Sequence, residues 1–386
     1  MGVWGFLISR FVTGTVVFLA LTIGWLCQAE LPMGRFFATV IPLMKGIMPP
    51  TVVGHGKMKG TPPVPDDMEI HGRPAAERFL TLPGTGDLMP ANGLGLCCRP
   101  TAYDDVLVRR SVLWYLLLGG RHLDGAHLYL NHEAVGLGIH DAVARGIDRK
   151  DIFVTTKLFC THFGYNTTLE TVPKFLDEMG LEYIDLVLMH SPSAFPFITS
   201  NECTKRGVDA RTCRQETWKA LSELRAKGLI RNVGVSNFGP RHLQDIEDLQ
   251  LEDGSNIAPI TNNQIQYSPF APKHIQDTVE YCRDHNITVT AYSPLGGLTH
   301  RDLAEATKAL QVIAERYQVT VAQVMLRWVV QKNMAVIPGT GNPKHMEENL
   351  AIYDFELSDA DMQAIHNLQF EDQAEKFFFL NISSLP

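Results

Sequence analysis

The chain has 386 residues, of which 45% are hydrophobic and 20% charged, and such a composition is typical of a globular protein with one large or two ordinary domains. Its formal net charge is -8, and no run of Lys and Arg offsets that charge locally. The sequence therefore argues against nucleic acid as a partner.

An uncharged apolar segment lies near the N-terminus, between Arg10 and Glu30. It reaches the roughly 20 residues that a helix needs to span a bilayer, which predicts a single-pass membrane anchor. A cleaved signal peptide is the alternative, because Cys27–Ala29 follow the apolar core as cleavage-type residues. We assign residues 1–29 to this anchor or signal segment. The charges on its two sides are too balanced to fix its orientation.

A linker and a folded domain are expected to follow. Residues 30–76 are assigned to the linker, because their Pro- and Gly-rich part lacks apolar periodicity. The folded domain is expected to occupy residues 77–386. At its start, two short apolar runs surround the turn PGTGD at 83–87, a pattern typical of a β-hairpin.

Beyond the hairpin, short strand-like runs alternate with helix-like segments. The expected strands cover residues 93–97, 121–126, 152–158, 184–190, 231–237, 261–267, 288–294 and 334–339. Between them, 216–228 and 314–333 show the clearest helical spacing of apolar residues, with Gly228 as a helix cap. Eight such repeats predict an α/β fold, a (β/α)8 TIM barrel. The alternative, a doubly wound sheet, requires a G-x-G-x-x-G motif that the sequence lacks.

Three histidines lie close together at the second expected strand: His122, His127 and His132. Metal ligands on one helix face lie about four residues apart, and those on one strand face two. The spacing here is five residues, which suits neither. We therefore expect no metal site and expect these histidines to take no part in the chemistry.

Chemistry in such a barrel lies at the carboxyl ends of its strands. Those ends carry Asp124, Lys157 and His190, and Tyr129 follows Asp124 in the next loop. The ammonium of Lys157 is expected to lower the pKa of Tyr129, and Asp124 to keep that lysine charged. Tyr129 would then donate a proton to a developing alkoxide while His190 orients the carbonyl oxygen. Because the hydride must come from a cofactor, the pattern predicts carbonyl reduction.

The segments around these four residues are RHLDGAHLYLNHEAVG, VTTKLF and DLVLMHSP, and they are followed by NVGVSNF, NNQIQYSPF, TAYSPLG and VIPGTGNPKHMEENL. Over residues 79–370 this set resembles the aldo-keto reductase family. The resemblance implies that Asp124, Tyr129, Lys157 and His190 are catalytic. It also implies a small-molecule aldehyde or ketone as substrate and NADPH, or alternatively NADH, as cofactor.

The resemblance further implies a set of cofactor-binding residues around the barrel mouth. Tyr292 is placed under the nicotinamide, Ser236, Asn237 and Gln264 at its carboxamide, Ser293 and Leu295 along the pyrophosphate, and Thr340, His345, Glu348 and Asn349 toward the adenosine end. A strand aromatic in the core is the alternative interpretation of Tyr292.

The chain departs from the family pattern at the phosphate site. Many members grip the 2′-phosphate of NADPH with a Lys and an Arg after the eighth strand, where this chain has Gly339 and His345. Lys344, or the N-terminus of a helix near Asn342, is left to bind phosphate. NADPH is still expected as the cofactor, with NADH as the alternative.

The substrate pocket departs as well. Family members often carry Trp where this chain has Cys97 and Ser191, so these substrate-binding positions predict smaller or more polar walls. The adjacent Cys97 and Cys98 are interpreted as two small buried residues, with a redox switch as the alternative. The polar insertion at 193–214 is expected to overhang the mouth as a lid.

The cellular location is predicted from cysteines and sequons. Cys203 and Cys213 flank a polar loop and are expected to pair in an oxidising lumen. Sequons at Asn166, Asn286 and Asn381 permit glycans there. We therefore expect a lumenal or membrane-anchored protein of the secretory pathway or endoplasmic reticulum, with a cytosol-facing orientation still open.

Two functions of different classes fit the sequence. One is an NAD(P)H-dependent aldehyde or ketone reductase. The other is a non-enzymatic module that binds or senses nicotinamide nucleotides at a membrane. The presence of Asp124, Tyr129, Lys157 and His190 together, called the tetrad below, favours the enzyme, because a binding module has no need of all four.

Overall fold

The computed structural model of the chain describes residues 79–99, 102–193, 201–253, 257–296 and 304–368. The predicted anchor or signal segment, the linker and the sequon at Asn381 lie outside these residues. Within the described ranges, no helix is long and apolar enough to cross a membrane.

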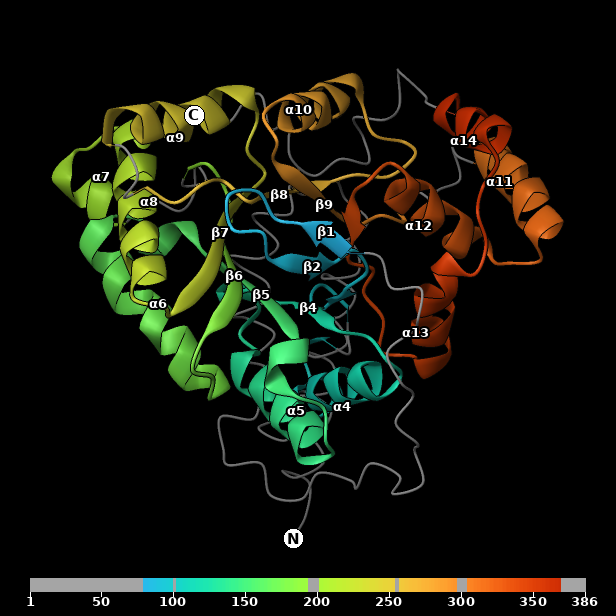
Figure 1. Ribbon diagram of the computed structural model, residues 1–386, viewed down its shortest axis with the longest axis horizontal. Coiled ribbons are helices and arrows are strands. Elements are labelled where there is room, and N and C mark those ends of the chain that lie inside the picture. The colour runs from blue at the N-terminus through green and yellow to red at the C-terminus, as the bar shows by residue number, and fades with distance from the viewer. Residues whose placement is uncertain (1–78, 100–101, 194–200, 254–256, 297–303, 369–386) are drawn as a thin grey trace, which may run out of the picture. The chain divides into compact units, whose positions relative to one another are not determined.

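Eight parallel strands form a curled sheet at the centre of the fold (Figure 1). They are β3 (Leu94–Gly95), β4 (His122–Asp124), β5 (Phe153–Leu158), β6 (Ile184–Met189), β7 (Ile230–Ser236), β8 (Asn262–Gln266), β9 (Thr288–Tyr292) and β10 (Ala335–Val336), each hydrogen bonded to the next. Every expected strand is present, and the observed ends differ from the predicted ones by at most three residues.

The two edges of this sheet also meet. The amide of Gly93 donates to the carbonyl of Val336 at 2.8 Å, and the amide of Val336 donates to Ala91 at 2.8 Å. Strands that follow one another in chain order and join first to last form a barrel, whereas a doubly wound sheet reverses its order midway. The fold agrees with the predicted (β/α)8 barrel.

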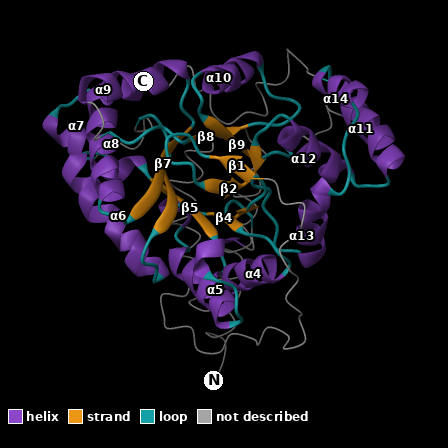
Figure 2. Cartoon of the chain, in the orientation of Figure 1, coloured by secondary structure: helices purple, strands orange, loops and turns teal. Residues whose placement is uncertain are grey.

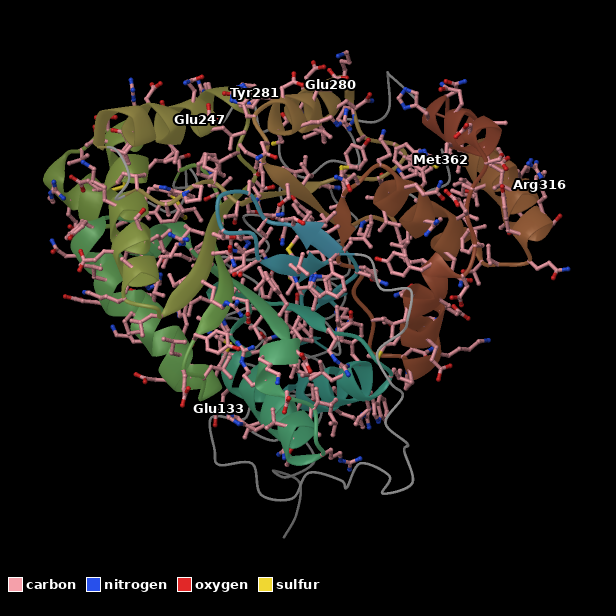
Figure 3. The ribbon with its side chains drawn as sticks, in the orientation of Figure 1. Glu133, Glu247, Glu280, Tyr281, Arg316 and Met362 are labelled. Carbon is pink, nitrogen blue, oxygen red and sulfur yellow. A yellow bond between two sulfur atoms is a disulfide. The ribbon has the colours of Figure 1, made fainter. Side chains whose placement is uncertain are left out.

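Helices surround the strands (Figure 2). They are α4 (Asp105–Leu117), α5 (His132–Ala144), α6 (Tyr165–Met179), α7 (Glu202–Arg206), α8 (Ala210–Ala226), α9 (Pro240–Asp253), α10 (Lys273–Asp284), α11 (Ala304–Tyr317), α12 (Val321–Gln331), α13 (Pro343–Leu350) and α14 (Asp359–His366). Their apolar sides, including Trp218 and Trp328, are buried in one core against the strands. Charged side chains such as Glu133, Glu280 and Arg316 lie on the outer side (Figure 3).

The predicted hairpin is present as β1 (Phe79–Thr81) and β2 (Leu88–Pro90), which pair antiparallel. Leu82 and Met89 of the hairpin are fully buried in a cluster that includes Phe153, at the start of β5. The hairpin therefore covers the N-terminal end of the barrel, opposite the end where chemistry is expected.

The expected single helix over residues 314–333 is wrong. The helix is interrupted at Gln318, which adopts a left-handed conformation with φ of 57°. As a result α11 ends at Tyr317, and a second helix, α12, begins at Val321. Thr320 accepts from the amide of Gln323, and the Gln323 side chain accepts from the amide of Thr320. This capping box has a T-x-x-Q sequence signature that marks a helix start and was missed inside an apolar periodic stretch.

The helix expected at 216–228 is present but longer. It begins at Ala210 because the Asp209 side chain accepts from the amide of Thr212 at 3.0 Å and caps the first turn. It ends at Ala226, and its C-cap is Lys227, one residue earlier than the predicted cap Gly228. Gly228 follows the cap in a left-handed conformation with φ of 76°. On its inner side Trp218 and Leu221 are fully buried.

Candidate active site

A buried ion pair lies at the carboxyl ends of β4 and β5. Lys157 Nζ donates to Asp124 Oδ1 at 2.6 Å and to the carbonyl of Gly125 at 2.8 Å. The two side chains are only 1% and 2% exposed. Burial lowers the pKa of Lys157, while the charge of Asp124 and its hydrogen bond act in the opposite direction. The predicted pairing of these residues is confirmed.

Tyr129 completes a short 3₁₀ turn, His127–Tyr129, that follows β4. Its hydroxyl accepts a hydrogen bond from Lys157 Nζ at 3.4 Å. The expected lowering of its pKa is wrong: burial and then the negative charge of Asp124 hold the pKa of Tyr129 well above its usual value. The phenol is therefore protonated at neutral pH, which is the form that a proton donor needs.

His190 directly follows β6 and faces Tyr129 edge-on, with ring centroids 5.9 Å apart. Burial and then the charge of Lys157 hold the pKa of His190 well below its usual value, so the ring is neutral. Phe159 packs edge-on against the same imidazole, with ring centroids 5.8 Å apart. Sequence reasoning missed this aromatic wall, although Phe159 stands two residues after Lys157 in the quoted motif.

Gln264 joins the tetrad in a way that sequence reasoning did not foresee. Its Nε2 donates to Asp124 Oδ2 at 2.6 Å, so both carboxylate oxygens of Asp124 accept hydrogen bonds. Gln264, which was predicted to bind the carboxamide of the nicotinamide, thus lies beside the carboxylate of Asp124. No sequence signal marked this contact, because β4 and β8 are four strands apart in the sheet and far apart in the sequence.

Three further predicted cofactor residues lie together beside His190. Tyr292, at the end of β9, donates its hydroxyl to Asn237 Oδ1 at 3.0 Å. Asn237 Nδ2 donates to the carbonyl of His190 and to Ser236 Oγ, both at 3.1 Å. Asn237 has φ of 63°, a left-handed conformation that Asn adopts more readily than most residues.

The other predicted cofactor residues border the loops after β9 and β10. Ser293 and Leu295 are half-buried just after β9. The expected helix near Asn342 is α13, which Asn342 caps by accepting from the amide of Lys344 at 3.0 Å. Around it, Thr340 and Asn349 are buried, Glu348 is half-buried, and His345 and Lys344 are exposed.

The two predicted substrate positions, Cys97 and Ser191, lie in the loops after β3 and β6. Cys97 is half-buried, but Cys98 is exposed, with φ of 67°, so the interpretation as two buried residues is wrong. The two sulfur atoms are bonded to each other. Ser191 is fully buried, and its hydroxyl donates to the carbonyl of Ser193 at 2.8 Å, which stabilises the loop after β6.

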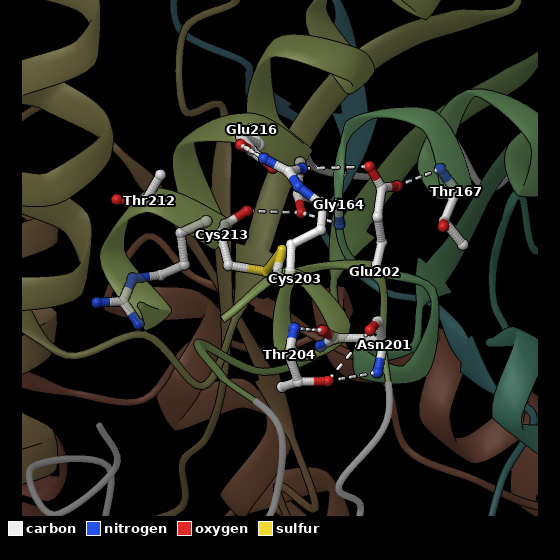
Figure 4. Close-up of a disulfide and its surroundings, with 12 residues drawn as sticks. Gly164, Thr167, Asn201, Glu202, Cys203, Thr204, Thr212, Cys213 and Glu216 are labelled. Carbon is white, nitrogen blue, oxygen red and sulfur yellow. Dashed lines mark hydrogen bonds and ion pairs between the residues drawn. A yellow bond between two sulfur atoms is a disulfide. The ribbon is translucent and has the colours of Figure 1, made fainter. Parts of the chain in front are cut away.

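The predicted lid contains α7 and the start of α8, and its residues 194–200 lie outside the described ranges. The expected pair Cys203 and Cys213 forms a disulfide (Figure 4). Beside it, Glu202 accepts from the amide of Thr167 at 2.7 Å, and Asn201 donates to the carbonyl of Cys160 at 3.0 Å. The insertion is therefore attached to the loop and helix that follow β5.

The three histidines of the second strand region have structural contacts. His122 lies between the carbonyl of Pro90 and Thr155 Oγ1. His132 lies between Glu178 and Thr156, and His127 stacks on Phe175. In the part of the chain that the structure describes, no cluster of three or more His, Cys, Asp or Glu could hold a metal ion.

Comparisons with known proteins agree with this geometry. A sequence profile of the Aldo/keto reductase family matches residues 93–369. The chain is 34% identical over 281 residues to a 9,11-endoperoxide prostaglandin H2 reductase of Trypanosoma cruzi, covering 72% of this chain and 88% of the relative. It is 33% identical over 297 residues to aldo-keto reductase family 1 member A1 of Sus scrofa, covering 74% and 87%.

Solved structures agree as well. The fold matches that of a Bombyx mori aldo-keto reductase in complex with NADP, with a TM-score of 0.66 and 27% identity, covering 80% of this chain and 96% of that chain. A family profile that spans most of the described barrel, together with relatives above 30% identity, establishes the relationship. The chain belongs to the aldo/keto reductase family.

Proposed function

We propose that the protein reduces an aldehyde or ketone to an alcohol with a nicotinamide cofactor, NADPH in preference to NADH, and that Tyr129 is the proton donor. The observation that carries this proposal is the chain of contacts from Asp124 through Lys157 Nζ to the hydroxyl of Tyr129. A buried, protonated phenol beside a fixed cation is suited to give up its proton only when a basic oxygen forms next to it.

Each residue of the tetrad has a separate task in this reaction. Tyr129 donates its proton to the oxygen of the reacting carbonyl, and the ammonium of Lys157 stabilises the phenolate that results. Asp124 holds that ammonium in place by its 2.6 Å hydrogen bond. The neutral ring of His190 orients the carbonyl oxygen by hydrogen bonding, without adding a charge. The bound cofactor supplies the hydride.

The residues at the mouth fit a nicotinamide. Tyr292 is half-buried and its hydroxyl is held by Asn237, so its ring has a defined orientation at the end of β9. An aromatic ring of this kind packs well against a flat heterocycle. Ser236 and Asn237 bring a hydroxyl and an amide, which suit the polar carboxamide of the same ring.

The substitution Tyr129→Phe tests this function. It should lower the rate of NADPH oxidation with a panel of aldehydes and ketones by about 10²-fold or more, because the proton donor is lost. Nucleotide binding, followed by fluorescence, should stay within about threefold of the native value, since the ring remains. Equal turnover by the two proteins would overturn the role of Tyr129. Tight nucleotide binding without any turnover by the native protein would instead favour the nucleotide-sensing module.

We also propose that the barrel is lumenal and held at the membrane by the N-terminal segment. The buried disulfide Cys203–Cys213 supports this proposal, because disulfides persist mainly in oxidising compartments. Two of the three sequon asparagines, Asn166 and Asn286, are exposed, although Asn166 Nδ2 donates to Glu202 Oε1 at 3.1 Å. Asn286 lies in the turn before β9, at the end of the barrel away from the mouth.

Glycan mapping tests this location. The full chain, expressed in eukaryotic cells, should lose apparent mass when an enzyme removes N-glycans, and Asn286→Gln should shrink that loss. The matched control is Asn333→Gln, which changes an asparagine outside any sequon. A native chain that shows no loss of mass would place the barrel on the cytosolic side or outside the pathway.

A further inference from the structure

Two adjacent cysteines form a disulfide in the loop after β3. The sulfur atoms of Cys97 and Cys98 are bonded to each other. Cys98 is exposed to solvent and Cys97 is half-buried. A second disulfide, between Cys203 and Cys213, is buried. A small molecule in solution can therefore reach the first disulfide far more easily than the second.

The backbone of this pair is restrained. Cys98 has φ of 67°, a left-handed conformation that is unfavourable for residues other than glycine. The bond to Cys97 ties the two side chains together across a single peptide unit and so limits the conformations open to Cys98. Breaking the bond removes that limit, and the backbone of the pair is then free to relax to a more favourable conformation.

The same loop is attached to the active site on both sides of the pair. Before the pair, the amide of Leu96 donates to the carbonyl of Asp124 at 2.9 Å. Asn131 lies two residues after Tyr129. Its Nδ2 donates to the carbonyl of Leu96 at 3.1 Å and, beyond the pair, to that of Ala102 at 3.3 Å. A change in the backbone of the pair therefore takes place between fixed points, beside the turn that carries Tyr129.

A cation lies beside the pair. Arg99 Nη1 donates to the carbonyl of Cys97 at 3.4 Å and to that of Gly95 at 2.6 Å. Burial lowers the pKa of Arg99 to about 10, which still leaves the guanidinium charged at neutral pH. A cation in this place stabilises the thiolate that leaves when a disulfide is opened, and it therefore favours attack on the bond.

We propose that the Cys97–Cys98 disulfide is a thiol-exchange site, at which a low-molecular-weight thiol of the glutathione class reduces the pair and so loosens the substrate side of the mouth. The exchange itself follows from the exposure of Cys98 and from the cation beside Cys97. The effect on substrate rests on the proposed function and on the expected position of Cys97 at the carbonyl pocket.

The reaction balances over two exchanges. The thiolate of one small thiol attacks the exposed sulfur of Cys98, the bond between the two cysteine sulfurs breaks, and its electron pair leaves on the sulfur of Cys97, which takes up a proton. A second small thiol then attacks the first at the mixed disulfide and releases Cys98 as a thiol. The two small thiols leave joined as a disulfide, so they are oxidised by the two electrons that the cysteine pair gains.

The first experiment follows the cysteines of the full-length protein by thiol labelling and peptide mass spectrometry, independently of activity. The protein is equilibrated in mixtures of reduced and oxidised glutathione before it is labelled. The Cys97–Cys98 pair should open at a ratio of reduced to oxidised glutathione about tenfold or more below the ratio that opens Cys203–Cys213, because exposed disulfides are the labile ones. Since both disulfides are in one molecule, the buried one serves as the internal control.

The second experiment measures the KM of an aldehyde or ketone in NADPH-dependent reduction. Opening the pair should raise this KM by about threefold or more, because one wall of the pocket loses its fixed shape. Cys98→Ser cannot form the bond, so it should show the raised KM from the start and no response to glutathione. Cys203→Ala with Cys213→Ala keeps the pair and should respond as the native protein does. Melting temperatures show that each variant is folded.

Each result has a distinct meaning. Free thiols at Cys97 and Cys98 in protein prepared without a reducing agent would overturn the inference, and so would a pair that opens no more easily than Cys203–Cys213. Opening without a change in KM, or an equal response of Cys98→Ser and the native protein, would overturn the effect on substrate. A pair that opens in a native protein that reduces no carbonyl in either state would instead overturn the proposed function and leave the exchange site standing.

Discussion

Burial acts in opposite senses on the groups of the tetrad. It raises the pKa of Tyr129 and lowers those of Lys157 and His190, because in each case it disfavours the charged form. Tyr129 and His190 are thereby kept neutral. The charges of Lys157 and Asp124 persist together because each stabilises the other across 2.6 Å. The site therefore contains one buried ion pair with two neutral groups beside it.

Replacing one partner of that ion pair should destabilise the fold. Lys157→Met leaves the carboxylate of Asp124 buried without its cation, which should cost about 3–5 kcal/mol of unfolding free energy. Asp124→Asn combined with Lys157→Met removes both charges and should cost less than Lys157→Met alone. Urea denaturation of the native protein and of the single and double variants measures the coupling. Additive losses in this cycle would show that the two groups do not stabilise one another.

At the scale of single residues, sequence reasoning succeeded where one rule fixed the position. Asp124, Lys157 and His190 stand at strand ends, and parallel strands bring such ends together. It failed where the outcome depends on neighbours from distant elements. The direction of the Tyr129 pKa follows from the depth of burial and from Asp124, and the contact of Gln264 with Asp124 joins two distant strands.

At the scale of elements, strands and the hairpin were predictable because alternating apolar runs and a Gly-rich turn are local patterns. The break between α11 and α12 was not, because the apolar period continues across it and only the Thr320–Gln323 capping box marks it. The bond between Cys203 and Cys213 was expected from two cysteines that flank a short polar loop, and α7 within that loop was not.

The disulfide should stabilise the segment around α7. It closes a loop with a sequence separation of 10 residues, for which loop-closure entropy predicts about 2–3 kcal/mol of unfolding free energy. Cys203→Ala with Cys213→Ala should lose about that amount in urea denaturation. A reducing agent should lower the stability of the native protein and leave that of the double variant nearly unchanged. Equal sensitivity of both proteins to the reducing agent would assign the effect to other cysteines.

At the scale of the whole molecule, acid should unfold the barrel through its histidines. Burial, and then the charges of His132 and His162, lower the pKa of His127 to about 4. An unfolded histidine titrates near 6.5, so the unfolded chain binds the proton first. The stability that the neutral form of His127 contributes is therefore fully present above about pH 6.5 and is lost as the pH falls from there toward 4.

His127→Phe should reduce that loss, because it keeps a ring stacked on Phe175 and removes the titrating group. Urea midpoints at pH 7.5 and pH 5 measure the effect, and the exposed His140→Gln serves as the matched control. Equal pH dependence in the native protein and in His127→Phe would show that other groups, such as His122 or His162, dominate the acid response.

The hairpin β1–β2 has a consequence for how the barrel can be attached to anything else. The described part of the chain enters the barrel through this hairpin, at the end that Leu82 and Met89 close. Phe79, the first described residue, therefore lies at the end of the barrel opposite Tyr129 and His190. A tag or partner attached at Phe79 of a chain shortened to the described barrel would therefore be attached at the end away from Tyr129 and His190.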